Sequence, residues 1–173
     1  MKLSTLMLAL GLAAAATPAQ TMSLTSSDLA PGATIATRHI YPRCGGQNES
    51  PQLSWSGPPA GTKSYALTMI DLDVKPSQWS HWIVVGLPAQ TTSLARGAAL
   101  PSGATAVVSN FGDAAYDGPC PPTGSGVHHY EITIWALPVD AVAIAPDEKA
   151  AEVSAALAKI ALAKASLTGW VKR

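Results

Sequence analysis

The stretch that decides the fold is YDGPCPPTGSGVHHYEITIWAL, residues 116–137. Its first half is rich in Gly, Pro and Ser, which interrupt helices and strands, and it is predicted to be a loop. Its second half, from Val127, alternates apolar and polar residues in the manner of a half-buried β-strand. The alternation puts His128 and Tyr130 on the apolar face and His129 on the opposite face. A polar pair on a core-facing strand end, beneath a loop with free backbone N–H groups, indicates either a pocket wall or a buried pair bonded to nearby carbonyls.

A second polar stretch favours the pocket. Asp71 ends one apolar run that is predicted to be a central strand, and His81 opens the next run. Neighbouring strands joined by a short loop bring these two ends side by side. If the strand from residue 127 pairs with them, Asp71 and His81 join His128 and Tyr130 at one rim of a sheet.

Such a cluster suits an anion. A carboxylate beside an imidazole favours the protonated ring and raises the His pKa from its ordinary value of about 6.5. A protonated His donates from both nitrogens, a Tyr donates its hydroxyl, and N–H groups of a Gly-rich turn add an anion nest. The expected ligand is therefore a phosphate ester, a phospholipid head group or a carboxylate, bound without a metal ion or other cofactor.

The same residues allow an alternative enzymatic interpretation. Asp71, His81 and His128 would form a two-histidine, one-carboxylate metal site, or would act as general acid and base on a phosphoester. Either arrangement would make the protein a hydrolase. The sequence has no Gly-x-Ser-x-Gly elbow and no His-Glu-x-x-His motif. Binding without catalysis is therefore the favoured function, and no catalytic residue is assigned.

The first nineteen residues have the pattern of a secretory signal peptide rather than a buried N-terminal helix. Lys2 gives a positive start, residues 6–16 are apolar, and Thr17-Pro18-Ala19 is a small-residue exit suited to cleavage. Residues 20–173 are then expected to form a single domain. No later run is long and apolar enough to suggest an integral membrane segment. The predicted location is the periplasm or the extracellular medium.

Charge and cysteine content limit the partners. The chain has 11 Lys and Arg against 11 Asp and Glu, so it carries no basic field for nucleic acid and no polybasic patch for membranes. Cys44 and Cys120 are its only cysteines, and both lie in Gly- and Pro-rich loops. In an exported protein they are expected to form a disulfide; free thiols or a soft-metal pair are the alternatives.

The remaining segments predict a mostly antiparallel β domain with a C-terminal helix. Strands are expected at residues 22–30, 34–40, 53–55, 64–72, 81–87, 104–109 and 127–137. The helix is expected at 146–164, with an apolar stripe that packs on the sheet, formed by Val153, Leu157, Ile160 and Ala161. Trp170 is expected to dock on the surface near the chain end, and His39 to be solvated.

These motifs resemble the phosphatidylethanolamine-binding protein family, and within it the bacterial Raf kinase inhibitor-like branch. The matching segments are GGQNESP (45–51), LSW (53–55), GTKS (61–64), Asp71-x-Asp73, His81-Trp82, GPCPP (118–122) and Gly126-x-His128-His129-Tyr130. The resemblance implies a PEBP-like fold in which a large antiparallel sheet packs on a smaller sheet beside an anion pocket. It places Asp71, His81, His128 and Tyr130 in that pocket, Asp73 in support, and Pro121 and Pro122 in the loop wall.

The resemblance also implies a homodimer and the inhibition of a partner kinase or protease, although an exported chain would not meet a cytosolic kinase. One segment departs from the family pattern. The family usually has Asp-Pro-Asp-Ala-Pro, whereas this chain has Asp71-Leu72-Asp73-Val74-Lys75-Pro76. Loss of the first Pro frees a backbone N–H. The pocket rim is therefore expected to differ there, with Lys75 as an added charge.

Overall fold

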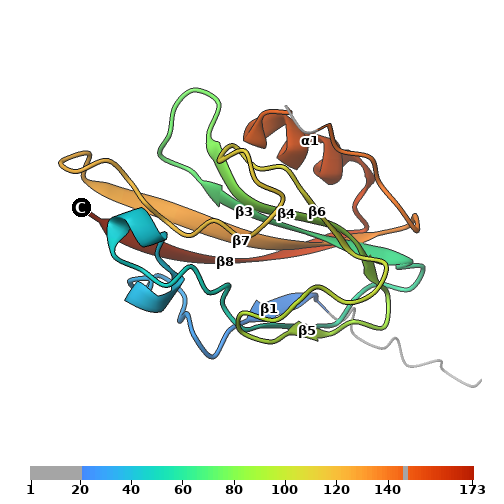
Figure 1. Cartoon of the computed structure of the whole chain (residues 1–173). Coiled ribbons are helices and arrows are strands. Elements are labelled where there is room, and N and C mark those ends of the chain that lie inside the picture. The colour runs from blue at the N-terminus through green and yellow to red at the C-terminus, as the bar shows by residue number, and fades with distance from the viewer. Residues whose placement is uncertain (1–20, 146–147) are drawn as a thin grey trace, which may run out of the picture.

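The computed structural model describes residues 21–145 and 148–173. The predicted signal peptide, residues 1–19, and the first two residues of the predicted helix, 146 and 147, lie outside these ranges. The described chain forms a five-stranded sheet, a three-stranded sheet and a helix. Figure 1 shows the large sheet in the middle, the small sheet on one face and helix α1 on the other.

The large sheet is antiparallel throughout, in the order β6-β4-β3-β7-β8. Its strands are β3 (Ser64–Asp71), β4 (Trp79–Pro88), β6 (Thr105–Val107), β7 (Val127–Leu137) and β8 (Ala163–Lys172). Every residue of β3 is buried, as predicted for a central strand whose two faces are both covered. The small sheet has the order β1-β2-β5 and consists of β1 (Ser23–Thr25), β2 (Leu53–Ser56) and β5 (Ser93–Leu94). The predicted fold class is therefore confirmed.

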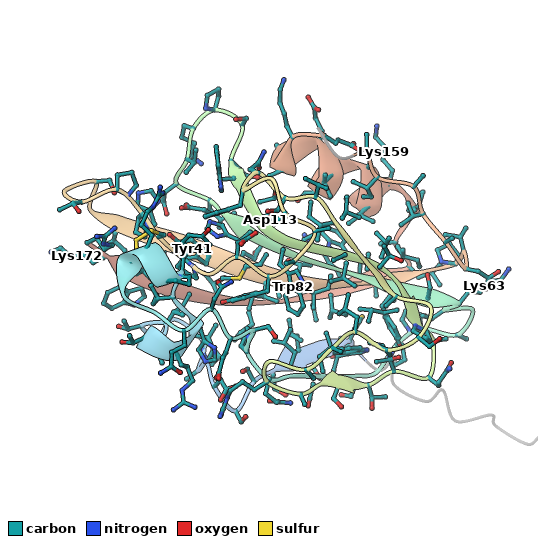
Figure 2. All side chains as sticks on the ribbon, viewed as in Figure 1. Tyr41, Lys63, Trp82, Asp113, Lys159 and Lys172 are labelled. Atoms are coloured by element: carbon teal, nitrogen blue, oxygen red, sulfur yellow. A yellow bond between two sulfur atoms is a disulfide. The ribbon has the colours of Figure 1, made fainter. Side chains whose placement is uncertain are left out.

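The alternation of β7 creates two cores, one on each face of the large sheet. Tyr130, Ile132 and Ile134 face the small sheet and belong to the larger core, together with Trp82. Trp135 faces the other way and packs with Val153 and Leu157 of α1 (Ala150–Ile160). The predicted bounds and face assignment of residues 127–137 are both correct. Trp82 accordingly lies between the two sheets in Figure 2.

The C-terminal part of the prediction is wrong in two respects. The helix is shorter than residues 146–164, since it begins at Ala150 and ends at Ile160, and Ile160 is 37% exposed rather than part of the packed stripe. The chain does not end in a surface-docked tail, because residues 163–172 form β8 along the edge of β7. Ala and Lys, which are frequent in this segment, have high intrinsic helix propensities. Pairing with a long buried strand overrides that preference here.

The segment between β1 and β2 also differs from expectation. Residues 34–40 form one parallel bridge, Thr34 to Trp170, and then a 3-10 turn, η1 (Thr37–His39), instead of a strand. His39 is buried rather than solvated, and its Nδ1 lies 2.7 Å from the carbonyl oxygen of Glu49. A second turn, η2 (Pro42–Cys44), follows and brings the chain to the pocket described below.

Candidate functional site

Two central strands bring three of the predicted polar side chains together. Asp71 ends β3 directly opposite Tyr130 of β7, and residues paired in this way share a face of the sheet. His128 lies two positions before Tyr130 and therefore occupies the same face. Its Nδ1 donates to Asp71 Oδ2 at 2.6 Å, and both side chains are buried. The strand register thus produces a carboxylate–imidazole pair next to a phenol.

His81 reaches this group through an irregularity in β4. Met69 pairs with Trp82 but Ile70 pairs with Ser80, so His81 is the extra residue of a β-bulge. In a regular strand, the neighbouring side chains of His81 and Trp82 would point to opposite faces of the sheet. The bulge allows both to point to the same face. The His81 ring packs edge-on to the Tyr130 ring, with centroids 5.1 Å apart. Its Nδ1 donates to the carbonyl oxygen of Asp117 at 2.8 Å, which fixes the orientation of the ring.

These side chains form the base of a pocket of about 770 Å³. Tyr41, from the segment between η1 and η2, lines the pocket, which lies near that end of the large sheet and far from Lys63 near the opposite end (Figure 2). Six of the seven predicted ligand-binding residues line it: Asp71, His81, Pro121, Pro122, His128 and Tyr130. The seventh, Asp73, lies outside. Its carboxylate accepts from the backbone N–H and from Nδ1 of His129, and its own N–H donates to Asp71 Oδ1 at 2.9 Å.

The backbone N–H of Asp73 therefore orients the Asp71 carboxylate from outside the pocket, so Asp73 has a supporting position. The backbone hydrogen bond from His129 holds the pKa of Asp73 below its ordinary value. His129 itself is exposed on the other face of β7 and does not line the pocket, as the alternation indicated.

The sequence prediction missed the mouth of the pocket. Tyr41, Arg43, Trp79 and Phe111 line it in addition to the predicted residues. Phe111 is the chain's only phenylalanine, and its ring centroid lies 5.0 Å from that of Tyr41 and 6.2 Å from that of Trp79. Trp79 is two residues from His81 and Arg43 is next to Cys44, so proximity to predicted site residues was the available signal.

The departure from the family pattern has a different effect from the one expected. The freed N–H of Leu72 donates to the carbonyl oxygen of His129 at 2.9 Å, which extends the β3–β7 pairing by one bond. Lys75 Nζ donates to the carbonyl oxygen of Leu72 at 2.6 Å and does not line the pocket. The prediction of an added charge from Lys75 is therefore wrong. Among the described residues that line the pocket, Arg43 is the one Lys or Arg.

A disulfide closes one wall. Cys44 and Cys120 are bonded, with Cα atoms 5.5 Å apart and 76 positions between them in the sequence. The bond joins the η2 segment, which carries Arg43, to the Pro121–Pro122 loop, and the disulfide prediction is confirmed. Figure 2 shows the sulfur atoms beside Tyr41. The alternatives of free thiols or a soft-metal pair are thereby excluded.

The electrostatics of the base differ from expectation for His81. Burial lowers the pKa of His81 to about 4, although the hydrogen bond to the carbonyl of Asp117 and the charge of Asp71 oppose the shift. A raised His pKa is therefore the wrong prediction for this residue. Burial, followed by the charge of Asp71, raises the pKa of Tyr130 above its ordinary value, so the phenol keeps its proton. The Tyr130 hydroxyl is buried and makes no hydrogen bond of ordinary geometry within the described chain, although the Asp71 carboxylate lies near enough to contribute to this shift.

This arrangement can do two things chemically. The Tyr130 hydroxyl can donate to an oxygen atom of a guest, and the two imidazoles each present Nε2, since both Nδ1 atoms are already used. In residues 21–145 and 148–173, no group of three or more His, Cys, Asp or Glu side chains has an arrangement that could hold a metal ion.

Comparison with known proteins gives a consistent result. The family model described as phosphatidylethanolamine-binding protein matches residues 25–172. The UPF0098 protein YbcL of Escherichia coli is 37% identical over 159 residues, covering 87% of each chain. The UPF0098 protein YbhB of the same organism is 38% identical over 155 residues, covering 85% of this chain and 98% of its own.

Two solved structures resemble the fold. The crystal structure of E. coli YbcL, described as a new member of the mammalian PEBP family, superposes with a TM-score of 0.80 at 36% identity, covering 88% of this chain and 98% of that one. A putative phosphatidylethanolamine-binding protein homologue from Chlamydia trachomatis gives a TM-score of 0.74 at 31% identity, covering 89% and 99%.

Proposed function

Because the chain belongs to the phosphatidylethanolamine-binding protein family, we propose that it is a non-enzymatic binding protein whose pocket holds a small anion. The guest is a phosphate ester, a phospholipid head group or a carboxylate. Asp71, His81, His128 and Tyr130 form the base of the site, and Asp73, Pro121 and Pro122 support it.

One observation carries this proposal. The hydroxyl of Tyr130 is fully buried, lines the pocket and makes no hydrogen bond of ordinary geometry in the described chain. Leaving such a donor unsatisfied costs about 1–3 kcal/mol, which a bound oxygen atom would recover. The paired imidazole of His128 and the guanidinium of Arg43 border the same space. A negatively charged oxygen can accept from the Tyr130 hydroxyl and lie beside the Arg43 guanidinium, which an apolar guest cannot do.

Titration with phosphoethanolamine, followed by NMR of the His81 and His128 side chains, tests the proposal. Both signals should shift and saturate with one ligand per chain. Tyr130→Phe should weaken binding about tenfold or more, since hydrogen bonds to charged groups contribute about 1.5–3 kcal/mol. Tyr116→Phe is the matched control, because the buried Tyr116 hydroxyl already donates to the carbonyl oxygen of His39, outside the pocket. Unchanged His signals at millimolar ligand would contradict the proposal.

The location is a further part of the proposal. The pattern of residues 1–19 supports export, so the mature protein should begin near Gln20. N-terminal sequencing of protein from the periplasm or the medium tests this, and an intact Met1 would contradict it. No helix among the described residues has the length and hydropathy to cross a bilayer.

A homodimer, and a partner protein that the ligand-bound form inhibits, belong to the same proposal. Light scattering tests the homodimer, and affinity capture with the ligand-bound protein tests the partner.

A further inference from the structure

The hydrogen bond at Nδ1 determines what His81 can offer a guest. A carbonyl oxygen only accepts, so the proton of a neutral His81 must lie on Nδ1, which faces the carbonyl of Asp117 at 2.8 Å. Nε2 then carries a lone pair. It has no partner in the described chain, and the ring lines the pocket. At the base of the pocket, His81 is therefore a hydrogen-bond acceptor.

The groups around His81 include both donors and acceptors. Both oxygens of Asp71, from β3, are already engaged, one by the N–H of Asp73 and one by Nδ1 of His128. From β7 come His128 and the Tyr130 hydroxyl. The loop that precedes β7 contributes Asp117, whose carboxylate accepts from Ser109 rather than from a pocket residue. The mouth contributes the phenol of Tyr41 and the guanidinium of Arg43. An anion oxygen that contacts Nε2 without bringing a proton would place its lone pair against that of the ring nitrogen.

We propose that the pocket selects anions that bring a proton with them, namely phosphate monoesters and inorganic phosphate, and holds that proton between the ligand and Nε2 of His81. This inference rests on the proposed function and specifies its ligand class. Sulfate and phosphate diesters carry no proton at neutral pH. They bind only when His81 takes up a proton from solvent.

The preference for a phosphate monoester over sulfate is set by the difference between two free-energy costs, that of protonating the ligand and that of protonating His81. Burial holds the pKa of His81 at about 4. The second pKa of a phosphate monoester is about 6. Protonating the monoester at pH 7 is therefore easier by about two pKa units, or about a hundredfold. Because the bound state holds one proton more than the free dianion and neutral His81, binding of either anion at pH 7 should take up about one proton.

Isothermal titration of the full-length mature protein with glycerol 3-phosphate and with sulfate, from pH 5 to pH 8, tests this inference. Two buffers of different ionisation enthalpy count the protons taken up. Glycerol 3-phosphate affinity should be level up to about pH 6 and then fall about tenfold per pH unit, whereas sulfate affinity should already fall tenfold between pH 5 and 6. Glycerophosphoethanolamine, the diester form of a lipid head group, should behave like sulfate. If it instead matches glycerol 3-phosphate, the selection of monoesters is overturned.

His81→Gln adds a second readout. A Gln amide presents a donor near the position of Nε2 that does not titrate, so the preference for glycerol 3-phosphate over sulfate and the proton uptake should both disappear. His129→Gln, on the exposed face of β7, is the matched control and should behave as wild type. Equal affinities and no proton uptake in the wild-type protein overturn this inference and leave anion binding intact. Absence of binding by all three ligands overturns the proposed function as well. If His81→Gln does not fold, the wild-type proton count decides alone.

Discussion

Gly118 has no room for a side chain. A Cβ atom there would lie 2.1 Å from the carbonyl oxygen of His39 and 2.7 Å from the backbone nitrogen of Tyr41. Both are backbone atoms of the segment that leads to the pocket mouth, so they cannot move aside as a flexible side chain would. The glycine thus lets the loop that carries Pro121 pack directly against the η1–η2 segment.

We expect Gly118→Ala to lower the free energy of unfolding by roughly 3 kcal/mol, as overpacking against rigid neighbours does. Gly45→Ala is the control, because a Cβ at Gly45 meets nothing within 4 Å. That variant should lose only the cost of a left-handed backbone, about 1 kcal/mol. Urea unfolding measures both variants. Equal losses in the two variants would show that close packing at Gly118 is not what limits stability.

Trp79 is a second single residue with a testable role, because it is placed to contact the organic group of a phosphate ester. Its side chain lies at the pocket mouth beside Phe111, and the residue is 38% exposed. We expect Trp79→Ala to weaken binding of phenyl phosphate about fivefold, since an aromatic contact contributes about 1 kcal/mol. Inorganic phosphate should bind as before. Val139→Ala, a similarly exposed residue outside the pocket, is the control, and calorimetry compares the two ligands.

At the scale of elements, the disulfide and a set of hydrogen bonds hold the same wall independently. Asn48 bridges it, with its Nδ2 donating to the carbonyl oxygen of Tyr116 and its Oδ1 accepting from the N–H of Gly118. The N–H of Tyr41 donates to the carbonyl oxygen of Pro119 at 3.1 Å. The wall should therefore keep its shape in the folded protein when the disulfide is absent.

Replacing both cysteines, Cys44→Ser with Cys120→Ser, should lower the free energy of unfolding by about 4 kcal/mol, because the disulfide closes a long loop in the unfolded chain. Phosphoethanolamine affinity should remain close to that of the wild type under conditions where the variant is folded. Denaturation and calorimetry on one sample separate the two effects. A variant that is stable but does not bind would show that the disulfide, and not Asn48, shapes the wall.

Elements also show where sequence patterns suffice. Strand β7 was predictable to its bounds because its alternation faces two separate cores. Strand β8 was not, because three of its inward positions, Ala163, Ala165 and Gly169, are too small to give a clear apolar period, and only Leu167 and Val171 supply larger side chains. The site was largely predictable from the strand ends. Its mouth was not, because the bulge at His81 and the approach of Arg43 depend on pairing and loop packing that no local pattern encodes.

At the scale of the whole molecule, two neighbouring buried groups give opposite pH dependences of stability. The pKa of His81 is about 4 in the folded protein, below its ordinary 6.5, so acidification from pH 6.5 to 4 protonates the unfolded chain first and removes stability. Burial, opposed by the Ser109 hydrogen bond, raises the pKa of Asp117 from 3.8 to about 6, so acidification through pH 6 protonates the folded chain first and adds stability. Each shift corresponds to about 3 kcal/mol at its full extent. The two contributions therefore largely cancel between pH 6 and 4.

Asp117→Asn should remove one side of this balance while keeping the acceptor for Ser109. We expect the unfolding free energy of the wild type minus that of Asp117→Asn to rise by about 2 kcal/mol as the pH falls from 6.5 to 4. Taking the difference between the two proteins cancels the pH-dependent contribution of every other carboxyl group to the unfolding free energy. His81→Asn, which keeps a donor for the carbonyl of Asp117, should show a difference that falls over the same range, because the variant escapes the cost that acid imposes on the wild type. Urea unfolding at half-unit pH intervals measures both differences. A flat Asp117→Asn difference would mean that its carboxyl group does not titrate differently in the folded and unfolded states.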